Sequence, residues 1–166
     1  MTVVLRTAGA IDHRGLWALN GLTNVGHTAD PTLPVRLPLP DGPPTAFPDL
    51  ADVEASFLAA GGDFLVGVEG DAVVAMGGFR PVSPTVGEVL RVRVHPARRR
   101  DGLGRRLMDE LELRARRRGI DQLTLDTATN QPEAVAFYRG LGYREVRRET
   151  RPDWTWTLVF FTKSLV

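Results

Sequence analysis

The chain has 166 residues, 43% hydrophobic and 25% charged, which is typical of a globular domain long enough to bury its own core. It contains no cysteine, which excludes disulfides, thiolate metal sites and a cysteine nucleophile. A formal net charge of +1 argues against a general nucleic-acid binder, whose surface carries a large basic excess. No apolar run is long enough for a membrane helix and nothing reads as a signal peptide, so we expect one cytoplasmic domain over residues 1–166, away from the membrane.

The first third of the chain predicts a short strand at residues 3–8 and a helix at 11–22. Residues 29–49 follow, with seven prolines, and proline suits neither a helix nor a central strand. A loop of this length in a compact domain is usually functional or disordered. Helical spacing of apolar residues resumes near residue 49, at Leu50, Val53, Phe57 and Leu58.

The rest of the chain alternates strands and helices. Residues 64–69 and 72–80 predict two strands joined by a tight turn, and a further strand ends at Pro96. Residues 104–118 predict an amphipathic helix, and a strand and another helix follow, the latter capped by an Asn-x-x-Glu pattern at Asn130 and Glu133. Two β-rich segments close the chain. This order predicts a mixed α/β fold, with antiparallel strands at both ends.

Positive charge is concentrated around one turn. Eleven of the chain's twenty arginines lie between Arg91 and Arg118, and the segment "RRDGLG" places Gly102 and Gly104 at the start of a helix. Free backbone N–H groups and the positive end of the helix dipole favour an anion there, and arginines add charge-assisted hydrogen bonds. The dinucleotide-binding fingerprint fails because Leu107 stands where its third glycine belongs, and the Walker pattern is absent. A merely solvated basic helix does not explain the paired glycines.

Two segments carry a family resemblance. "RRDGLG", shortly after "VHP", resembles the acetyl-CoA signature of the GNAT superfamily of N-acetyltransferases, and "NQPEAVAFYRGLGYREV" at 130–146 resembles its second half. Residues 63–147 fit closely, and residues 1–62 fit only in the order of elements. The resemblance implies a central, mostly antiparallel twisted sheet of about seven strands, with helices on both faces and with splayed fourth and fifth strands.

By this resemblance, acetyl-CoA is the co-substrate and no metal is expected. The pantetheine arm pairs with the fourth strand, and main-chain amides of the arginine loop hold the pyrophosphate. The 3′-phosphate meets one of the neighbouring arginines, which the sequence does not single out. The cofactor-binding residues expected on these grounds are Val92, Arg93, Val94, Arg99, Arg100, Asp101, Gly102, Leu103, Gly104, Arg105, Asn130 and Tyr138.

The expected reaction is acyl transfer from a thioester to an amine. A free alkyl amine, with a pKa of about 10, must lose a proton, and the leaving thiolate must gain one. Tyr138 is the candidate acid, although its spacing on the helix equally fits a packing residue. Glu88 is the candidate base, because several relatives place a glutamate there, and the alternative is a solvated carboxylate. A backbone N–H near Val94 would stabilise the oxyanion.

The acceptor stays open among small amines and peptide amines. Residues 29–49 are the expected acceptor region, with a dimer contact or a disordered insertion as alternatives; their aspartates Asp30, Asp41 and Asp49 favour a cationic amine. We expect a homodimer, as is usual among relatives. Two competing functions remain: a non-catalytic protein that binds or senses CoA, and an arginine-rich nucleic-acid-binding module, although no nucleic-acid partner is expected.

Overall fold

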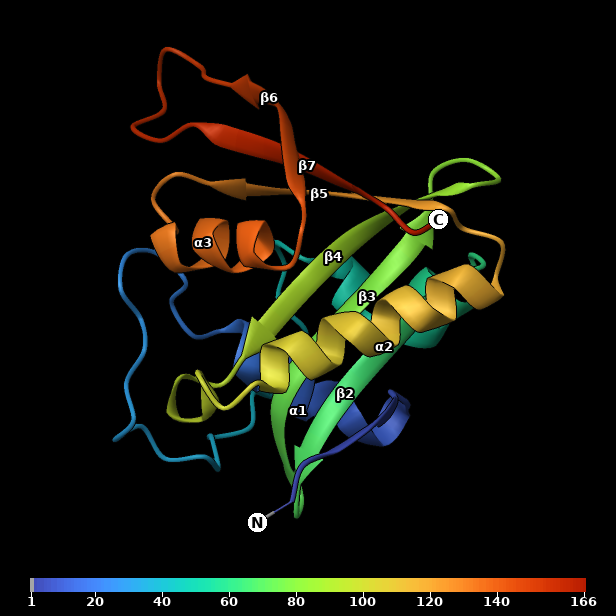
Figure 1. Cartoon of the computed structure of the whole chain (residues 1–166). Coiled ribbons are helices and arrows are strands. Elements are labelled where there is room, and N and C mark those ends of the chain that lie inside the picture. The colour runs from blue at the N-terminus through green and yellow to red at the C-terminus, as the bar shows by residue number, and fades with distance from the viewer. Residues whose placement is uncertain (1) are drawn as a thin grey trace.

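The computed structural model describes residues 2–166 and contains one seven-stranded sheet (Figure 1). Its strands lie in the order β1-β2-β3-β4-β5-β7-β6, and every neighbouring pair is antiparallel except β4 and β5, which are parallel. This confirms the predicted mixed, mostly antiparallel sheet. The strands are β1 (Val4–Thr7), β2 (Asp63–Glu69), β3 (Ala72–Pro81), β4 (Val86–Val94), β5 (Gln122–Ala128), β6 (Arg144–Glu149) and β7 (Leu158–Ser164).

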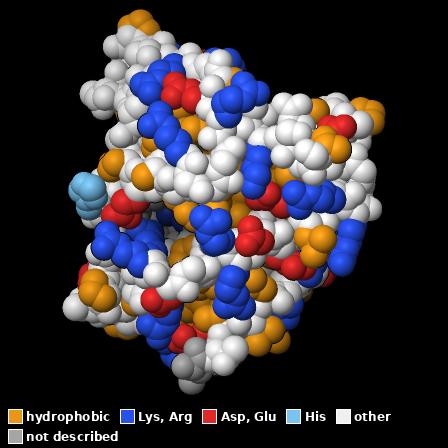
Figure 2. All heavy atoms as spheres, in the orientation of Figure 1, with side chains coloured by type: hydrophobic (Ala, Val, Ile, Leu, Met, Phe, Trp, Pro, Cys, Tyr) orange, Lys and Arg blue, Asp and Glu red, His pale blue; other side chains and the backbone are white. Residues whose placement is uncertain are grey.

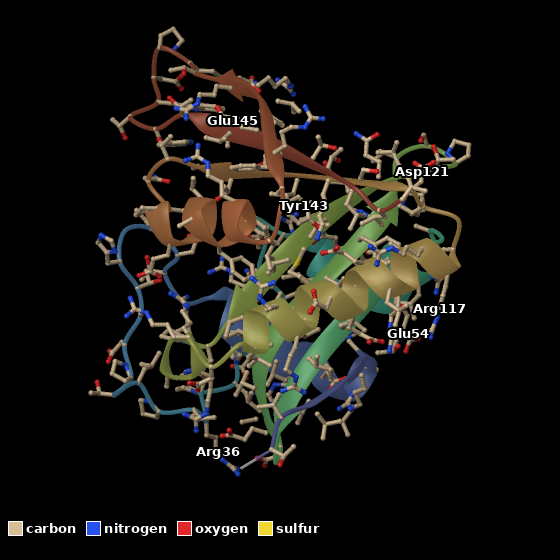
Figure 3. The ribbon with its side chains drawn as sticks, viewed as in Figure 1. Arg36, Glu54, Arg117, Asp121, Tyr143 and Glu145 are labelled. Carbon is tan, nitrogen blue, oxygen red and sulfur yellow. The ribbon has the colours of Figure 1, made fainter. Side chains whose placement is uncertain are left out.

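Helices cover both faces of the sheet, as predicted. α2 (Leu103–Arg117) and α3 (Pro132–Gly140) lie in front of it in Figure 1, and α1 (His13–Asn20) lies behind. The apolar face of α2 packs on β3 and β4 in one core, to which Tyr143, labelled in Figure 3, also belongs. A second core lies under α1. Basic side chains are spread over the α2–α3 face, with apolar atoms showing below α3 (Figure 2).

β4 and β5 separate soon after they meet. They pair only from Val86–Glu88 to Gln122–Thr124, and the rest of each strand has no strand partner across the gap. β4 also carries a bulge, where the register against β3 shifts and Arg91 takes a left-handed φ of 61°. Val92 then packs so close to Gly77 that a Cβ there would lie 3.0 Å from its Cγ2. The expected splay of the fourth and fifth strands is therefore present.

The helix expected to resume near residue 49 is not an α-helix. Residues Pro48–Ala51 form a 3₁₀ turn, and Glu54–Leu58 form one turn of π-helix. The carbonyl of Leu50, which a continuous helix would give to the N–H of residue 54, instead accepts a hydrogen bond of 2.6 Å from Trp17 Nε1. A tertiary contact thus replaces the regular hydrogen bond that the apolar spacing predicted. Similarly, the first helix begins at His13 rather than residue 11, after a 3₁₀ turn.

The proline-rich segment is held by contacts from several elements. Arg14 Nε donates to Pro40 O (2.9 Å), Arg36 pairs with Asp71 (2.6 Å), and the buried His95 ring donates from Nε2 to Pro34 O (2.9 Å). His95 Nδ1 accepts from the Ala97 N–H, which fixes the neutral tautomer. Residues 29–49 are thus tied to α1, to the turn between β2 and β3, and to the residue that follows β4.

Candidate active site

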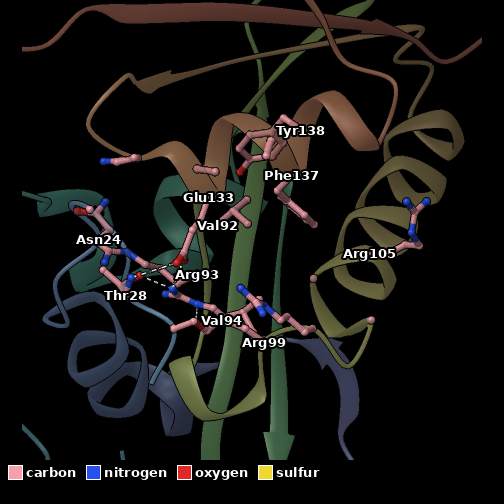
Figure 4. Close-up of a pocket in the computed structure, with 18 residues that line it drawn as sticks. Asn24, Thr28, Val92, Arg93, Val94, Arg99, Arg105, Glu133, Phe137 and Tyr138 are labelled. Carbon is pink, nitrogen blue, oxygen red and sulfur yellow. Dashed lines mark hydrogen bonds and ion pairs between the residues drawn. The ribbon is translucent and has the colours of Figure 1, made fainter. Parts of the chain in front are cut away.

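A cavity of about 550 Å³ lies where β4 and β5 separate. Its walls come from residues 92–94 of β4, the arginine loop and the start of α2, the front of α3, and the segment 24–29 (Figure 4). Apolar atoms of Val92, Ala134 and Phe137 line its interior, and basic groups surround its lower end. The cavity is thus continuous with the unpaired edge of β4.

At the lower end of the cavity, backbone N–H groups stand free at the start of α2. Arg100 and Gly102 both have left-handed φ values, 70° and 79°, which turn the chain sharply into α2. The N–H groups of residues 103–105 stand in the first helical turn and have no acceptor within the helix. A Cβ at Gly104 would lie 3.1 Å from the Phe137 ring, so glycine lets α3 approach this turn closely. These observations fit the phosphate-binding role predicted for the loop.

The arginines of the loop differ in what they contact. Arg98 makes a bidentate pair with Glu69 (2.9 and 2.9 Å), and Arg99 pairs with Glu133 at 2.9 Å, so both are already neutralised. Arg100 and Arg105 line the cavity and make no ion pair with any carboxylate in residues 2–166. Their charge is therefore available to a ligand.

Arg99 also joins the cavity wall to the segment 24–29. Its guanidinium donates to Glu133, to the Thr28 hydroxyl and to Val94 O (3.1 Å). The N–H of Thr28 donates to Glu133 (3.2 Å). Burial by itself would raise the pKa of Glu133, but the positive charge of Arg99 and this hydrogen bond together lower it. Sequence reasoning missed this contribution of Thr28 and Glu133, because the two residues lie far apart in the chain and no local pattern connects them.

Tyr138 is a packing residue that also forms part of the cavity wall. It is 8% exposed, packs against Phe137 and Tyr143 with ring centroids 5.1 and 5.7 Å apart, and also lines the cavity. Its hydroxyl points from α3 toward β4 (Figure 4). Burial, and secondarily the negative charge of Asp126, raises its pKa well above the ordinary value. The phenol therefore stays protonated at neutral pH.

Glu88 lies outside the cavity wall, at the last paired position of β4 and on the α1 side of the sheet. Its cross-strand partner is Arg80, and Thr124 is its neighbour on β5. Glu88 and Tyr138 thus lie on opposite sides of the gap between β4 and β5.

Three further residues expected at the cofactor do not line the cavity. Leu103 is 4% exposed and belongs to the core, and Asp101 is exposed in the turn. The carbonyl of Asn130 accepts from Gly26 N–H (2.7 Å). The predicted Asn-x-x-Glu cap is wrong, because Gln131 is the N-cap of α3 and Glu133 turns instead toward Arg99. Arg93 lines the cavity but directs its guanidinium to Leu22 O (2.7 Å).

No helix in residues 2–166 is both long and apolar enough to cross a membrane. No group of three or more histidine, cysteine, aspartate or glutamate side chains among those residues is arranged to hold a metal ion.

Comparison with known proteins agrees with this geometry. N-acetyltransferase 8F1 of Rattus norvegicus is 31% identical over 102 residues, covering 58% of this chain and 46% of its own length. The chain spans about half the length of the curated relatives it matches.

Solved structures share the fold. A GNAT-family acetyltransferase of Staphylococcus aureus Mu50 superimposes with a TM-score of 0.80 at 18% identity, over 99% of this chain and 100% of its own. The acetyltransferase yncA of Salmonella typhimurium, solved with its cofactor acetyl-CoA, gives 0.73 at 19% identity, over 100% and 95%. The sequence model of the Acetyltransferase (GNAT) family matches residues 32–143, and the chain therefore belongs to the GNAT family of acetyltransferases.

Proposed function

We propose that the chain transfers an acetyl group from acetyl-CoA to a primary amine by direct attack in a ternary complex. The observation that carries this proposal is the cavity at the splayed strands, because it joins an anion site at a helix N-terminus to an unpaired strand edge. A long ligand with phosphates at one end and an amide-containing arm at the other matches that arrangement. yncA, which shares the fold, was solved with acetyl-CoA.

The residues present fit the cofactor. The N–H groups of residues 103–105 would bind the pyrophosphate, and Arg100 and Arg105 are the two arginines of the wall left to pair with further phosphate oxygens. The unpaired edge of β4 from residue 92 to residue 94 would pair with the amide groups of the arm. The apolar atoms of Val92 and Phe137 exclude water along the arm.

The chemistry requires one bond to form and one to break. The acceptor nitrogen attacks the thioester carbonyl carbon, the C–N bond forms, the C–S bond breaks, and the proton lost by the amine is balanced by one gained at sulfur. Glu88 lies on the α1 side of the gap, where it would take the amine proton directly or through water. Tyr138 lies on the α3 side with its hydroxyl protonated, and it would donate to the sulfur. Backbone N–H groups of β4 near Val94 would stabilise negative charge on the carbonyl oxygen.

The first test separates binding from turnover. Calorimetry with coenzyme A should show binding by the wild-type protein and by Tyr138→Phe with similar affinity, while acetyl-CoA consumption over a grouped amine panel falls at least about tenfold in kcat for the variant. Tyr143→Phe is the matched control, because the Tyr143 hydroxyl is buried without a partner among the described residues and does not line the cavity. No binding of coenzyme A at millimolar ligand would overturn the proposal.

A second test addresses the base. If Glu88 is the base, the pH profile of kcat/KM of the wild-type protein should have an acidic limb, and Glu88→Gln should lower kcat/KM and remove that limb. A Glu88→Gln profile that kept the same acidic limb would assign the proton to another group.

A further inference from the structure

A cluster of opposite charges lies on the α1 side of the gap between β4 and β5. Arg91 makes a bidentate pair with Asp49, from Nε to Oδ1 (3.2 Å) and from Nη2 to Oδ2 (3.1 Å). Arg80, from the neighbouring strand, approaches the same carboxylate at 3.5 Å. One carboxylate therefore serves two guanidinium groups. Asp49, expected to attract a cationic acceptor, is instead committed to these arginines.

Both guanidinium groups are held in place and retain free donors. Arg80 lies 4.7 Å above the Phe57 ring and Arg91 4.5 Å above the Phe47 ring, so their planes are fixed by stacking. Arg80 makes no hydrogen bond within the part of the chain that the structure describes, although a guanidinium has five N–H donors. The pair is therefore preorganised to bind an anionic group.

The backbone of β4 directs Arg91 to this side. Arg91 has a φ of 61° at the bulge, a conformation that costs energy for any residue with a side chain. The bulge lets Val92 face the acetyl-CoA cavity, while Arg91 faces the opposite side of the sheet and Asp49. The strained residue thus stands next to the wall of the proposed active site, with its charge on the side where the acceptor would approach.

Two carboxylates border the same region without ion-pair partners. Glu88 is the cross-strand neighbour of Arg80, and Asp126 lies two residues beyond Thr124 on the facing strand, on the same side of the sheet. Neither makes an ion pair within 4.0 Å in residues 2–166. Partial loss of solvent raises the pKa of Asp126, although the positive charges of Arg91 and Arg147 oppose the rise.

We propose that the acceptor is an amino-acid-like zwitterion, a small amine with a carboxylate close to its nitrogen. Arg80 and Arg91 bind the carboxylate by charge-assisted hydrogen bonds, and the ammonium group lies toward Glu88 and Asp126 before it is deprotonated. A purely cationic acceptor, such as a polyamine or a lysine side chain, has no anionic group to accept the free guanidinium N–H donors of Arg80 and Arg91. This inference rests on the proposed acetyl transfer and specifies its substrate class.

The test compares matched acceptors. The twenty common amino acids, their amides and the corresponding decarboxylated amines are assayed for acetyl-CoA consumption with the wild-type protein. At least one free amino acid should exceed both its amide and its decarboxylated amine by about tenfold or more in kcat/KM. Arg80→Gln and Arg91→Gln should raise KM for that amino acid about 10- to 100-fold with little change in kcat, and should leave the amide unaffected.

The controls separate charge recognition from loss of fold. Arg117→Gln removes an exposed arginine at the far end of α2 (Figure 3) and should change neither parameter. Arg91→Lys keeps the positive charge, so it should retain part of the preference for the free amino acid over its amide that Arg91→Gln loses. Denaturant unfolding of each variant, with coenzyme A titration, checks that the fold and the cofactor site are intact.

The outcomes distinguish the two proposals. If amides or simple amines are acetylated as well as the free amino acids, the zwitterion inference is wrong and the acetyltransferase stands. If coenzyme A binds but no amine is consumed, the proposed acetyl transfer is wrong. Titration of the amino acids into the complex with coenzyme A then tests the proposed amino-acid binding site independently of turnover. Absence of any amino-acid binding in that titration overturns the inference.

Discussion

The two buried tyrosines predict a specific weakness at alkaline pH. Tyr138 and Tyr143 are the only tyrosines in the chain, and they are 8% and 3% exposed. Burial raises the pKa of both, with smaller contributions from Asp126 at Tyr138 and from Glu112 at Tyr143. In the unfolded chain each phenol ionises with an ordinary pKa of about 10. Above that pH the unfolded state loses protons that the folded state keeps.

The size of the effect follows from proton linkage. Each tyrosine removes about 1.36 kcal/mol of unfolding free energy per pH unit above about 10, until its own native pKa is reached. Two tyrosines together remove about 2.7 kcal/mol per pH unit, so about 4 kcal/mol is lost by pH 11.5. A domain of this kind has about 5 to 15 kcal/mol in total. We therefore expect alkaline unfolding to be controlled by these two side chains.

Denaturant unfolding between pH 8 and pH 11.5 measures the slope, and ultraviolet absorbance of phenolate follows ionisation in the native state. Tyr138→Phe and Tyr143→Phe should each reduce the slope by about half, and the double variant should abolish it. The single lysine, Lys163, does not absorb with phenolate and leaves the spectral readout clean. Ionisation of either tyrosine near pH 10 in a chain that is still folded would refute the reasoning.

Two further predictions concern stability. Gly62→Ala should lower the free energy of unfolding by about 3 kcal/mol or more, or prevent folding, because the new Cβ would lie 1.8 Å from the carbonyl oxygen of Phe79. Gly42 has open space around it, so Gly42→Ala should be nearly neutral in denaturant unfolding. Burial would raise the pKa of Asp12, but hydrogen bonds from Arg6 and from the backbone lower it. The ionised Asp12 therefore stabilises the folded state above about pH 3.9, and this stabilisation is lost as the pH falls through the lowered pKa. Asp12→Asn should flatten the acid limb of a stability–pH curve, and an unchanged limb would show that this pair does not contribute.

Much of the fold and of the cofactor site could be predicted from local patterns. Period-two and helical spacing located the strands and the long helix, because those patterns reflect which face each element buries. The glycines of "RRDGLG" predicted the start of the helix, and the structure explains both, because Gly102 takes a left-handed φ and Gly104 lets the Phe137 ring approach closely. Tyr138 followed from its motif, and its place in the cavity wall agrees with that prediction.

Other features were decided only by tertiary structure. The helix predicted near residue 49 does not form, because the carbonyl of Leu50 accepts a hydrogen bond from Trp17. No local pattern shows which distant side chain competes for a backbone group. The sequence predicts Glu133 as part of a helix cap, but in the structure it accepts a hydrogen bond from Arg99. The sequence predicts that Asp49 favours a cationic amine, but in the structure two arginines from neighbouring strands share its carboxylate.

The physical division is between near and far interactions. Turn chemistry, helix ends and the buried face of a strand depend on residues a few positions apart, so the sequence by itself determined them. Which charges remain unpaired beside the gap between β4 and β5 depends on side chains that strand pairing brings together from positions tens of residues apart, so only the folded chain decides it.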